Sequence, residues 1–287
     1  MPFGIIIHMR NSGERNQIST NTNWCVCAFR SMVLRVSDVY LCQIVDKEQI
    51  IDTAFSITIL CADLASVVRP GQFLHIKCGE DLLLRRPLSI CNVFVDTLTV
   101  VFDVKGKGTQ WLSQREPGDY INVLGPLGNG FNLPDGDIIV VGGGLGSPPM
   151  LFAADSANSG VTAILGFRDA SRVMLVNDFK EVCDAVYITT DDGSVGIHGS
   201  VVVPLEKLLK KGGYDAVLTC GQHAMEHAVA ELCKQYNIPC QVSLEERMGC
   251  GVGACLVCAC TIVKNGEENM SRVCRDGPVF DATDVVW

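Results

Sequence analysis

Hydrophobic and polar residues alternate over short runs between residues 37 and 133, and turn residues separate these runs. Short β-rich runs broken by glycine and proline are typical of a small antiparallel barrel. The turns include Arg69-Pro70-Gly71 and Glu116-Pro117-Gly118-Asp119. The predicted strands are 39–45, 56–61, 73–77, 97–104 and 120–124.

The pattern changes after residue 135, where compact apolar runs alternate with helical stretches. Strands that are apolar on both faces and separated by helices predict a parallel, doubly wound α/β sheet. The clearest helix is 224–236, which Asn237 and Pro239 end. The predicted strands are 138–141, 161–165, 185–188, 216–218 and 240–243.

Residues 1–33 are polar, show no sustained period and predict a disordered extension. The fold class expected for the rest is multi-domain. It consists of an antiparallel β-barrel at 34–134, an α/β domain with a parallel five-stranded sheet at 135–242, and a small C-terminal domain at 243–287.

The composition is that of an ordinary globular protein, with 48% hydrophobic and 19% charged residues in a chain of 287. A net charge of -9 gives no electrostatic footprint for nucleic acid or for an anionic membrane surface. No apolar run approaches the roughly 18 to 20 residues of a membrane span, and no signal peptide is evident. We therefore expect a soluble, cytoplasmic protein that binds neither nucleic acid nor membrane.

Four cysteines near the C-terminus, Cys250, Cys255, Cys258 and Cys274, follow the spacing C-x4-C-x2-C with the fourth after fifteen further residues. This is the ligand spacing of a plant-type [2Fe-2S] cluster, a one-electron carrier. Glycines 249, 251 and 253 would let the backbone wrap closely around the inorganic sulfides.

Two other interpretations of these cysteines remain open. Structural zinc usually takes two C-x2-C-like pairs on separate knuckles, so the spacing favours the cluster. Disulfides would require an oxidising compartment.

Cys260 lies two residues beyond Cys258 and could replace it as a ligand, although the x2 spacing favours Cys258. Most of the fifteen cysteines lie outside this set, and we interpret them as small buried residues in a reducing cytosol.

The first strand of the α/β region runs into a glycine-rich turn that contains Gly142, Gly143, Gly144 and Gly146. Glycine lets the backbone approach a pyrophosphate, and the following helix offers unpaired N–H groups. The turn is not a full G-x-G-x-x-G, so a simple tight βα turn is the alternative.

Two segments of the barrel region carry groups that suit phosphate. Arg85-Arg86-Pro87-Leu88-Ser89 combines a guanidinium able to bind phosphate in a bidentate way with a proline and a hydroxyl. Gly106-Lys107-Gly108-Thr109 offers backbone N–H groups and a hydroxyl before a predicted helix at 110–114. Each segment taken alone could equally be a surface turn.

His223, Glu226 and His227 form H-x-x-E-H, the inverted zinc-protease motif, at the start of the helix 224–236. No third ligand is evident in the sequence, and the helix fits the α/β domain without a metal. We therefore interpret the motif as part of an ordinary helix.

In this order, the segments 86–89, 108–109, 125–128 and 142–149 and the cysteine loop resemble the ferredoxin reductase superfamily. They are most similar to the electron transfer subunits of NAD-dependent, class B dihydroorotate dehydrogenase. The resemblance covers residues 37–285 and implies an FAD-binding barrel, an NAD-binding domain and a C-terminal [2Fe-2S] domain.

The resemblance also implies roles for individual residues. The segment 190–196 resembles the region near the nicotinamide nucleotide, and the glycine-rich turn would serve that nucleotide. The implied FAD-binding residues are Arg86, Pro87, Leu88 and Ser89 for the diphosphate and the isoalloxazine edge, Val101, Phe102 and Asp103 along the ring, and Gly108 and Thr109 at the phosphates.

NAD accepts two electrons as a hydride, whereas an iron–sulfur cluster changes by one, so a chain that holds both needs a flavin as converter. The resemblance implies a partner, the FMN-containing catalytic subunit of dihydroorotate dehydrogenase, in a heterotetramer with two copies of each chain. Electrons would pass from that FMN through the cluster and FAD to NAD, in pyrimidine (UMP) biosynthesis. We expect no catalytic residues for dihydroorotate oxidation in the present chain.

Two other functions remain open. A related flavin and [2Fe-2S] subunit could serve an NADPH:ferredoxin oxidoreductase or a sulfide dehydrogenase-type complex. A non-enzymatic redox sensor would need the cluster and would not oxidise NADH appreciably. The sequence does not fix the preference between NAD and NADP, because no acidic residue stands clearly at the end of the second parallel strand.

Overall fold

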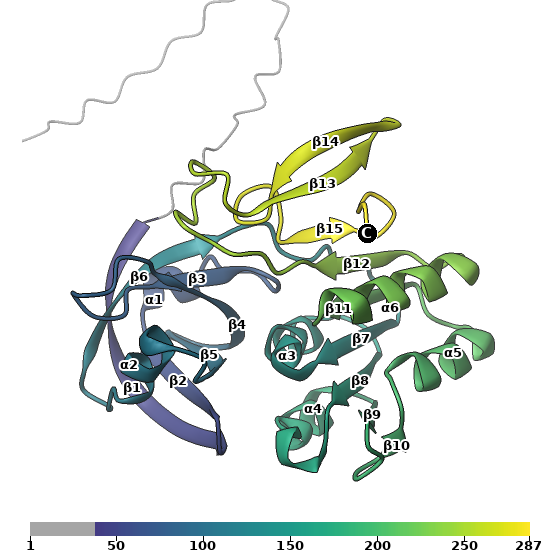
Figure 1. The fold of residues 1–287 in the computed structure, drawn as a ribbon. Coiled ribbons are helices and arrows are strands. Elements are labelled where there is room, and N and C mark those ends of the chain that lie inside the picture. The colour runs from purple at the N-terminus through teal and green to yellow at the C-terminus, as the bar shows by residue number, and fades with distance from the viewer. Residues whose placement is uncertain (1–37) are drawn as a thin grey trace, which may run out of the picture. The chain divides into compact units, whose positions relative to one another are not determined.

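Six antiparallel strands close into a barrel at the start of the described part of the chain, which is residues 38–287 of the computed structural model (Figure 1). The strand order around the barrel is β1-β2-β5-β4-β3-β6. The predicted extension at 1–33 lies outside the described residues. The bounds are β1 Asp38–Ile51, β2 Ala54–Leu60, β3 Phe73–Ile76, β4 Arg86–Phe94, β5 Thr97–Asp103 and β6 Tyr120–Leu127, with short helices α1 Ala62–Ala65 and α2 Lys107–Ser113.

The strand β4 is the one barrel strand that the hydrophobic pattern does not predict. Pro87 near its start cannot donate to a strand ladder, and the polar Ser89 and Asn92 break the apolar alternation. Pairing with β3 on one side and β5 on the other nevertheless holds this segment as a strand. The tertiary closure of the barrel therefore overrides a weak local signal.

A seven-stranded sheet follows the barrel, in the order β10-β9-β8-β7-β11-β12-β15. The predicted parallel five-stranded sheet is confirmed as its centre. Two short strands extend it, β10 in parallel beside β9 and β15 in antiparallel beside β12. The bounds are β7 Ile138–Gly143, β8 Val161–Phe167, β9 Ala185–Thr190, β10 Ile197–His198, β11 Ala216–Cys220, β12 Cys240–Ser243 and β15 Val279–Asp281.

Helices cover both faces of this sheet, as the doubly wound prediction requires (Figure 1). Ile138 of β7 belongs to the same core cluster as Met150 of α3. The next residue, Ile139, belongs to the opposite cluster, with Leu205 of α5 and Val229 of α6. The bounds are α3 Ser147–Asp155, α4 Val176–Val182, α5 Val202–Lys211 and α6 His223–Gln235, with the 3-10 turns η1 Gly144–Gly146 and η2 Ala170–Arg172.

The last part of the chain returns to the sheet through the hairpin of β13 Ala259–Lys264 and β14 Glu267–Arg272. Asn265 and Gly266, both at positive φ, make its two-residue turn. The sequence analysis missed this hairpin, although Asn-Gly between two β-rich runs is a strong hairpin signal. None of the described helices is both long and apolar enough to cross a membrane.

Candidate functional site

A cavity of about 430 Å³ brings the predicted flavin residues together at the edge of the barrel. From the barrel side it is lined by Phe73 at the start of β3, by the start of β4, by the end of β5 and by the start of α2. The opposite wall includes Cys220 and the chain that follows β12. The lining residues that the sequence analysis named are Arg86, Pro87, Leu88, Ser89, Val101, Phe102, Asp103 and Thr109.

The guanidinium of Arg86 lies against the first turn of α2. A Cβ on Gly108 would stand 2.4 Å from Nε of Arg86, so a side chain at position 108 would displace the guanidinium from this place. Within residues 38–287 no carboxylate forms an ion pair with Arg86. A guanidinium without an anionic partner on a cavity wall fits a phosphate ligand.

The hydroxyl of Thr109 is already used by its own loop. It accepts the N–H groups of Lys105 at 2.9 Å and Gly106 at 3.3 Å, and it donates to the Gly106 carbonyl. These bonds cap α2 and fix the loop. A phosphate here would therefore meet the loop backbone and Arg86 before it met a free hydroxyl.

Arg85, the neighbour of Arg86, has a different task. Its Nη1 donates to the carbonyl oxygens of His75 and Asn122, at 3.1 and 3.2 Å. These bonds tie the chain before β4 to β3 and β6. Arg85 therefore stabilises the barrel, whereas Arg86 lines the cavity.

A second cavity of about 870 Å³ lies over the carboxyl ends of the parallel strands. Gly143, Gly144 and Gly146 of the glycine-rich turn line it. A Cβ on Gly144 would meet no atom within 4 Å, so the backbone is open to a ligand at this point. Gly142 does not line the cavity, and a Cβ there would stand 2.7 Å from Cα of Ser147, so it serves close packing against α3.

Gly146 permits another close approach. A Cβ on this residue would stand 2.1 Å from the carbonyl oxygen of Cys220, which ends β11. The turn and β11 can therefore pack together only with glycine here. This is the helix–strand contact that glycine serves in dinucleotide-binding turns, and the cavity position fits a pyridine nucleotide.

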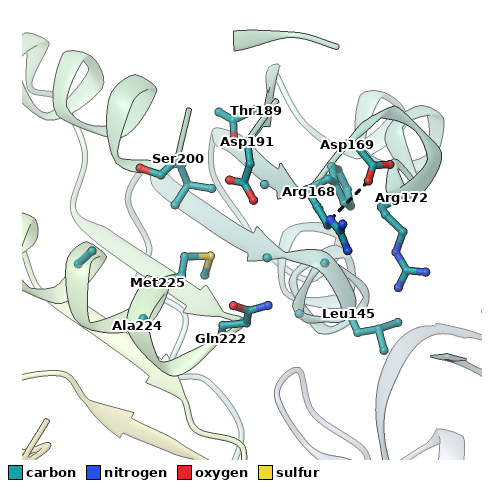
Figure 2. A pocket seen from close by; sticks show the side chains of 18 of the residues that line it. Leu145, Arg168, Asp169, Arg172, Thr189, Asp191, Ser200, Gln222, Ala224 and Met225 are labelled. Carbon is teal, nitrogen blue, oxygen red and sulfur yellow. Dashed lines mark ion pairs between the residues drawn. The ribbon is translucent and has the colours of Figure 1, made fainter. Parts of the chain in front are cut away.

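Asp169 stands at the rim of this cavity, and the sequence analysis missed it. Figure 2 shows Arg168 and Asp169 on one side and Gln222 and Met225 across from them. Asp169 follows the end of β8 by two residues, about 20 residues after the glycine turn, where dinucleotide folds place an acid for the ribose. The signal was present, but the predicted strand ended at 165 and left Asp169 in a loop.

The predicted segment 190–196 meets the cavity at Asp191, which follows β9. Thr190 is fully buried, and its hydroxyl donates to the Val195 carbonyl at 2.8 Å. Asp192 accepts the N–H of Ser194 at 2.9 Å within the turn itself. Of the loop residues 190–196, the described structure places only Asp191 on the cavity wall.

The two cavities share part of their walls. Asp103, Lys105, Leu145 and Glu245 line both. Asp103 is also paired with Arg172, at the rim of the larger cavity, so an ion pair connects β5 to the turn after β8. Ligands in the two cavities would therefore approach each other at this junction.

The cysteine loop surrounds the sulfur of Cys250 with backbone donors. The N–H groups of Val252, Ala254 and Cys255 point at this sulfur from 3.2 to 3.4 Å. Burial would raise the pKa of Cys250, but these donors outweigh it and lower the pKa to about 6. The thiolate is the form that binds a metal, so the loop is prepared for one.

The four predicted ligands lie as two pairs. Cys250 and Cys255 exchange N–H···S contacts of 3.4 Å, and the N–H of Cys274 reaches the sulfur of Cys258 at 3.5 Å. Two neighbouring pairs of thiols fit a binuclear cluster, which shares four thiolates between two irons.

Cys260 lies on β13, opposite Ser271 of β14, and belongs to the hairpin instead of the loop. Burial raises the pKa of Cys260 to about 11, which favours the neutral thiol. Within residues 38–287 no other residue donates a backbone N–H to the sulfur of Cys260, in contrast to Cys250 and Cys258.

The H-x-x-E-H residues have separate contacts. The rings of His223 and His227 lie against Trp287, with centroids 5.2 and 5.0 Å away. Glu226 is buried and accepts the N–H of Gly221 at 3.2 Å, and burial raises its pKa to about 9. These contacts account for the motif without a metal.

Comparison with known proteins finds chains similar to this one. Residues 245–286 match the family model of the iron-sulfur cluster binding domain of dihydroorotate dehydrogenase B. The chain is 41% identical to the electron transfer subunit of dihydroorotate dehydrogenase B (NAD(+)) of Desulforamulus reducens, over 78% of this chain and 89% of that one. Identity to the Geobacillus thermodenitrificans subunit of the same name is 40%, over 85% and 96%.

A solved structure is similar as well. It is that of an NADH-dependent reduced ferredoxin-NADP oxidoreductase, described in a study of flavin-based electron bifurcation. The TM-score is 0.78 at 31% identity, and the match covers 86% of this chain and 90% of that one.

Proposed function

The chain belongs to the family of the electron transfer subunits of NAD-dependent dihydroorotate dehydrogenase B, and from this premise we propose the path of the electrons. Electrons enter from the FMN of a catalytic partner subunit at the cysteine loop, pass through the FAD site and leave as hydride on NAD. The product of the partner's reaction, orotate, places the complex in pyrimidine biosynthesis. We propose a heterotetramer of two copies of each subunit.

The observation that carries this proposal is the shared wall of the two cavities. The flavin and nucleotide cavities share four lining residues, Asp103, Lys105, Leu145 and Glu245. A hydride would therefore be transferred over a short distance between the two ligands. Gly251 of the cysteine loop packs against the barrel strand β3, which pairs with the flavin segment of β4. The three sites therefore follow one another without a gap in the fold.

Separate groups of residues would hold the cluster, the flavin and the nucleotide. When bound, the cluster carries single electrons and the flavin exchanges either one or two, which connects the partner to NAD. Cys250, Cys255, Cys258 and Cys274 would hold the irons, and Arg86 would hold the flavin diphosphate. The backbone of the turn 142–146 would bind the nucleotide diphosphate and orient the nicotinamide.

The isolated chain tests this proposal. Anaerobically purified protein is expected to contain FAD and a [2Fe-2S] absorbance and to oxidise NADH with ferricyanide as acceptor. Alone it should not oxidise dihydroorotate, and addition of the FMN-containing partner should restore that activity with NAD as acceptor. A colourless protein, or a chain that oxidises dihydroorotate by itself, would contradict the proposal.

A second candidate function rests on the 31% identical ferredoxin-NADP oxidoreductase structure. A subunit of that kind would copurify with a large flavoprotein and not with an FMN-containing dehydrogenase. The copurified partner and its orotate-forming activity therefore separate the two. The expected cytoplasmic location stays a prediction.

We expect Asp169 to disfavour NADPH. Its carboxylate stands where the ribose 2′ position is recognised in dinucleotide folds, and a 2′-phosphate would meet a like charge. Asp169→Asn removes that charge and leaves the exposed Arg168 nearby, whose Nε lies 3.8 Å from the carboxylate. The ratio of kcat/KM for NADPH over NADH should rise about tenfold, or about 1.4 kcal/mol.

Asp191→Asn is the matched control, because this carboxylate lines the same cavity after the next strand. It should leave the ratio close to that of the unaltered protein. Equal changes in the two variants would show that the overall charge of the cavity, and not Asp169, sets the preference.

A further inference from the structure

A buried histidine stands between the flavin segment and the cysteine loop. His75, on β3, has no exposed surface, and neither of its ring nitrogens has a hydrogen-bond partner in the described structure. A buried polar group without a partner costs about 1 to 3 kcal/mol. Such a group calls for an explanation, and the place of the ring supplies one.

The ring of His75 adjoins both redox segments. Across the barrel ladder His75 pairs with Pro87 of the flavin segment. On the other side, a Cβ on Gly251 would stand 2.5 Å from Nδ1 of His75, so the cysteine loop lies directly on the ring. The backbones of Arg85 and Cys250 are both near enough to influence the ring, that of Arg85 more strongly, although no bond of good geometry is formed with either.

On the basis of the proposed function, we propose that His75 is a positioning residue for the cluster. Its ring N–H lies where it could donate to the carbonyl of Cys250, and this bond would fix the Cys250–Gly251 peptide at one orientation and distance from the flavin segment. In every protonation state the ring carries at least one N–H, so this role requires no particular charge.

The consequence for the cluster follows from the geometry of the peptide bond. In a trans peptide the carbonyl and the N–H point in opposite directions. A Cys250 carbonyl held toward His75 would turn the N–H of Gly251 away from the ring, and so would set the start of the turn whose next N–H groups, of Val252, Ala254 and Cys255, donate to the sulfur of Cys250. Gly251, at φ +74, can adopt this conformation without the strain of a side chain. Hydrogen bonds to the sulfurs are one of the factors that set the cluster potential.

The test replaces His75 in the full chain loaded with both cofactors. In His75→Leu we expect the midpoint potential of the cluster, measured by EPR-monitored redox titration, to become more negative. The equilibrium between reduced flavin and cluster should shift about tenfold, which is about 59 mV for one electron. Bleaching of the flavin by NADH should keep its rate, because the nucleotide cavity is untouched.

His75→Asn is the conservative variant, since its amide can donate in place of the ring, and it should restore the potential. Thr219→Val is the matched control, because Thr219 is also buried with an unpartnered hydroxyl but lies on β11. It should leave the potential unchanged. Loss of the cluster in His75→Leu with retention in His75→Asn supports the proposal as well.

An unchanged potential in His75→Leu, or identical behaviour of the Leu and Asn variants, overturns the proposal. The same measurements on the unaltered protein distinguish a failure of the His75 proposal from a failure of the proposed function. If it shows a [2Fe-2S] EPR signal and NADH bleaches its flavin, the function stands whatever His75 does.

Discussion

Cys258→Ser is expected to abolish the cluster: the visible absorbance of the [2Fe-2S] group and its EPR signal should be lost from the purified protein. Cys258 is buried, and its sulfur accepts the N–H of Cys274, the other predicted ligand of its pair. Serine cannot replace a thiolate in this buried place without a large loss of affinity for iron. Electron transfer from NADH to ferricyanide should survive, because it needs only the two cavities.

Cys260→Ser is the matched control, two residues further along the chain. Cys260 lies on the β13–β14 hairpin, and no other residue within 38–287 donates a backbone N–H to its sulfur. The cluster absorbance and the iron content should remain at those of the unaltered protein. The reverse outcome, with iron lost from Cys260→Ser and kept in Cys258→Ser, would move the ligand assignment by two residues.

The parallel sheet was predictable because the burial of its strands is visible in short stretches of the sequence. The strands β7, β8 and β11 are buried on both faces, so each appears in the sequence as a continuous apolar run between helices. The barrel was harder, because β4 contains Pro87 and polar residues and becomes a strand only through its neighbours. The strand β15 was not predictable from three residues, since its place beside β12 depends on how the whole C-terminal segment folds back.

The candidate site likewise combines features that short sequence patterns predict with features that depend on tertiary contacts. The cysteine spacing and the glycine turn are short-range patterns, and each was visible without a structure. The shared wall of the two cavities joins residues such as Lys105, Leu145 and Glu245, far apart in the chain and without a motif. His75 was invisible for another reason: a lone histidine in an apolar strand is ordinary, and only its burial between two sites makes it informative.

Arg86→Ala is expected to weaken FAD binding by roughly 10- to 150-fold. Arg86 is a cation on the wall of the smaller cavity, and no carboxylate in the described chain pairs with it. A charge-assisted hydrogen bond to phosphate contributes about 1.5 to 3 kcal/mol, which corresponds to this range. Flavin fluorescence released on dilution, or calorimetric titration of the flavin-free protein with FAD, would measure the loss.

Arg85→Ala separates binding from folding, because it removes the same side chain one position earlier. The guanidinium of Arg85 donates hydrogen bonds to the carbonyl oxygens of His75 and Asn122 and does not line the cavity. We expect a lower unfolding temperature, since the carbonyls of His75 and Asn122 lose their shared donor, together with nearly unchanged FAD affinity once the protein is folded. If Arg85→Ala lost FAD as severely as Arg86→Ala at a temperature where both are folded, the phosphate contact would have to be shared by the two arginines. If Arg86→Ala bound FAD normally, the flavin diphosphate would have to rest on the backbone of the 106–109 loop alone.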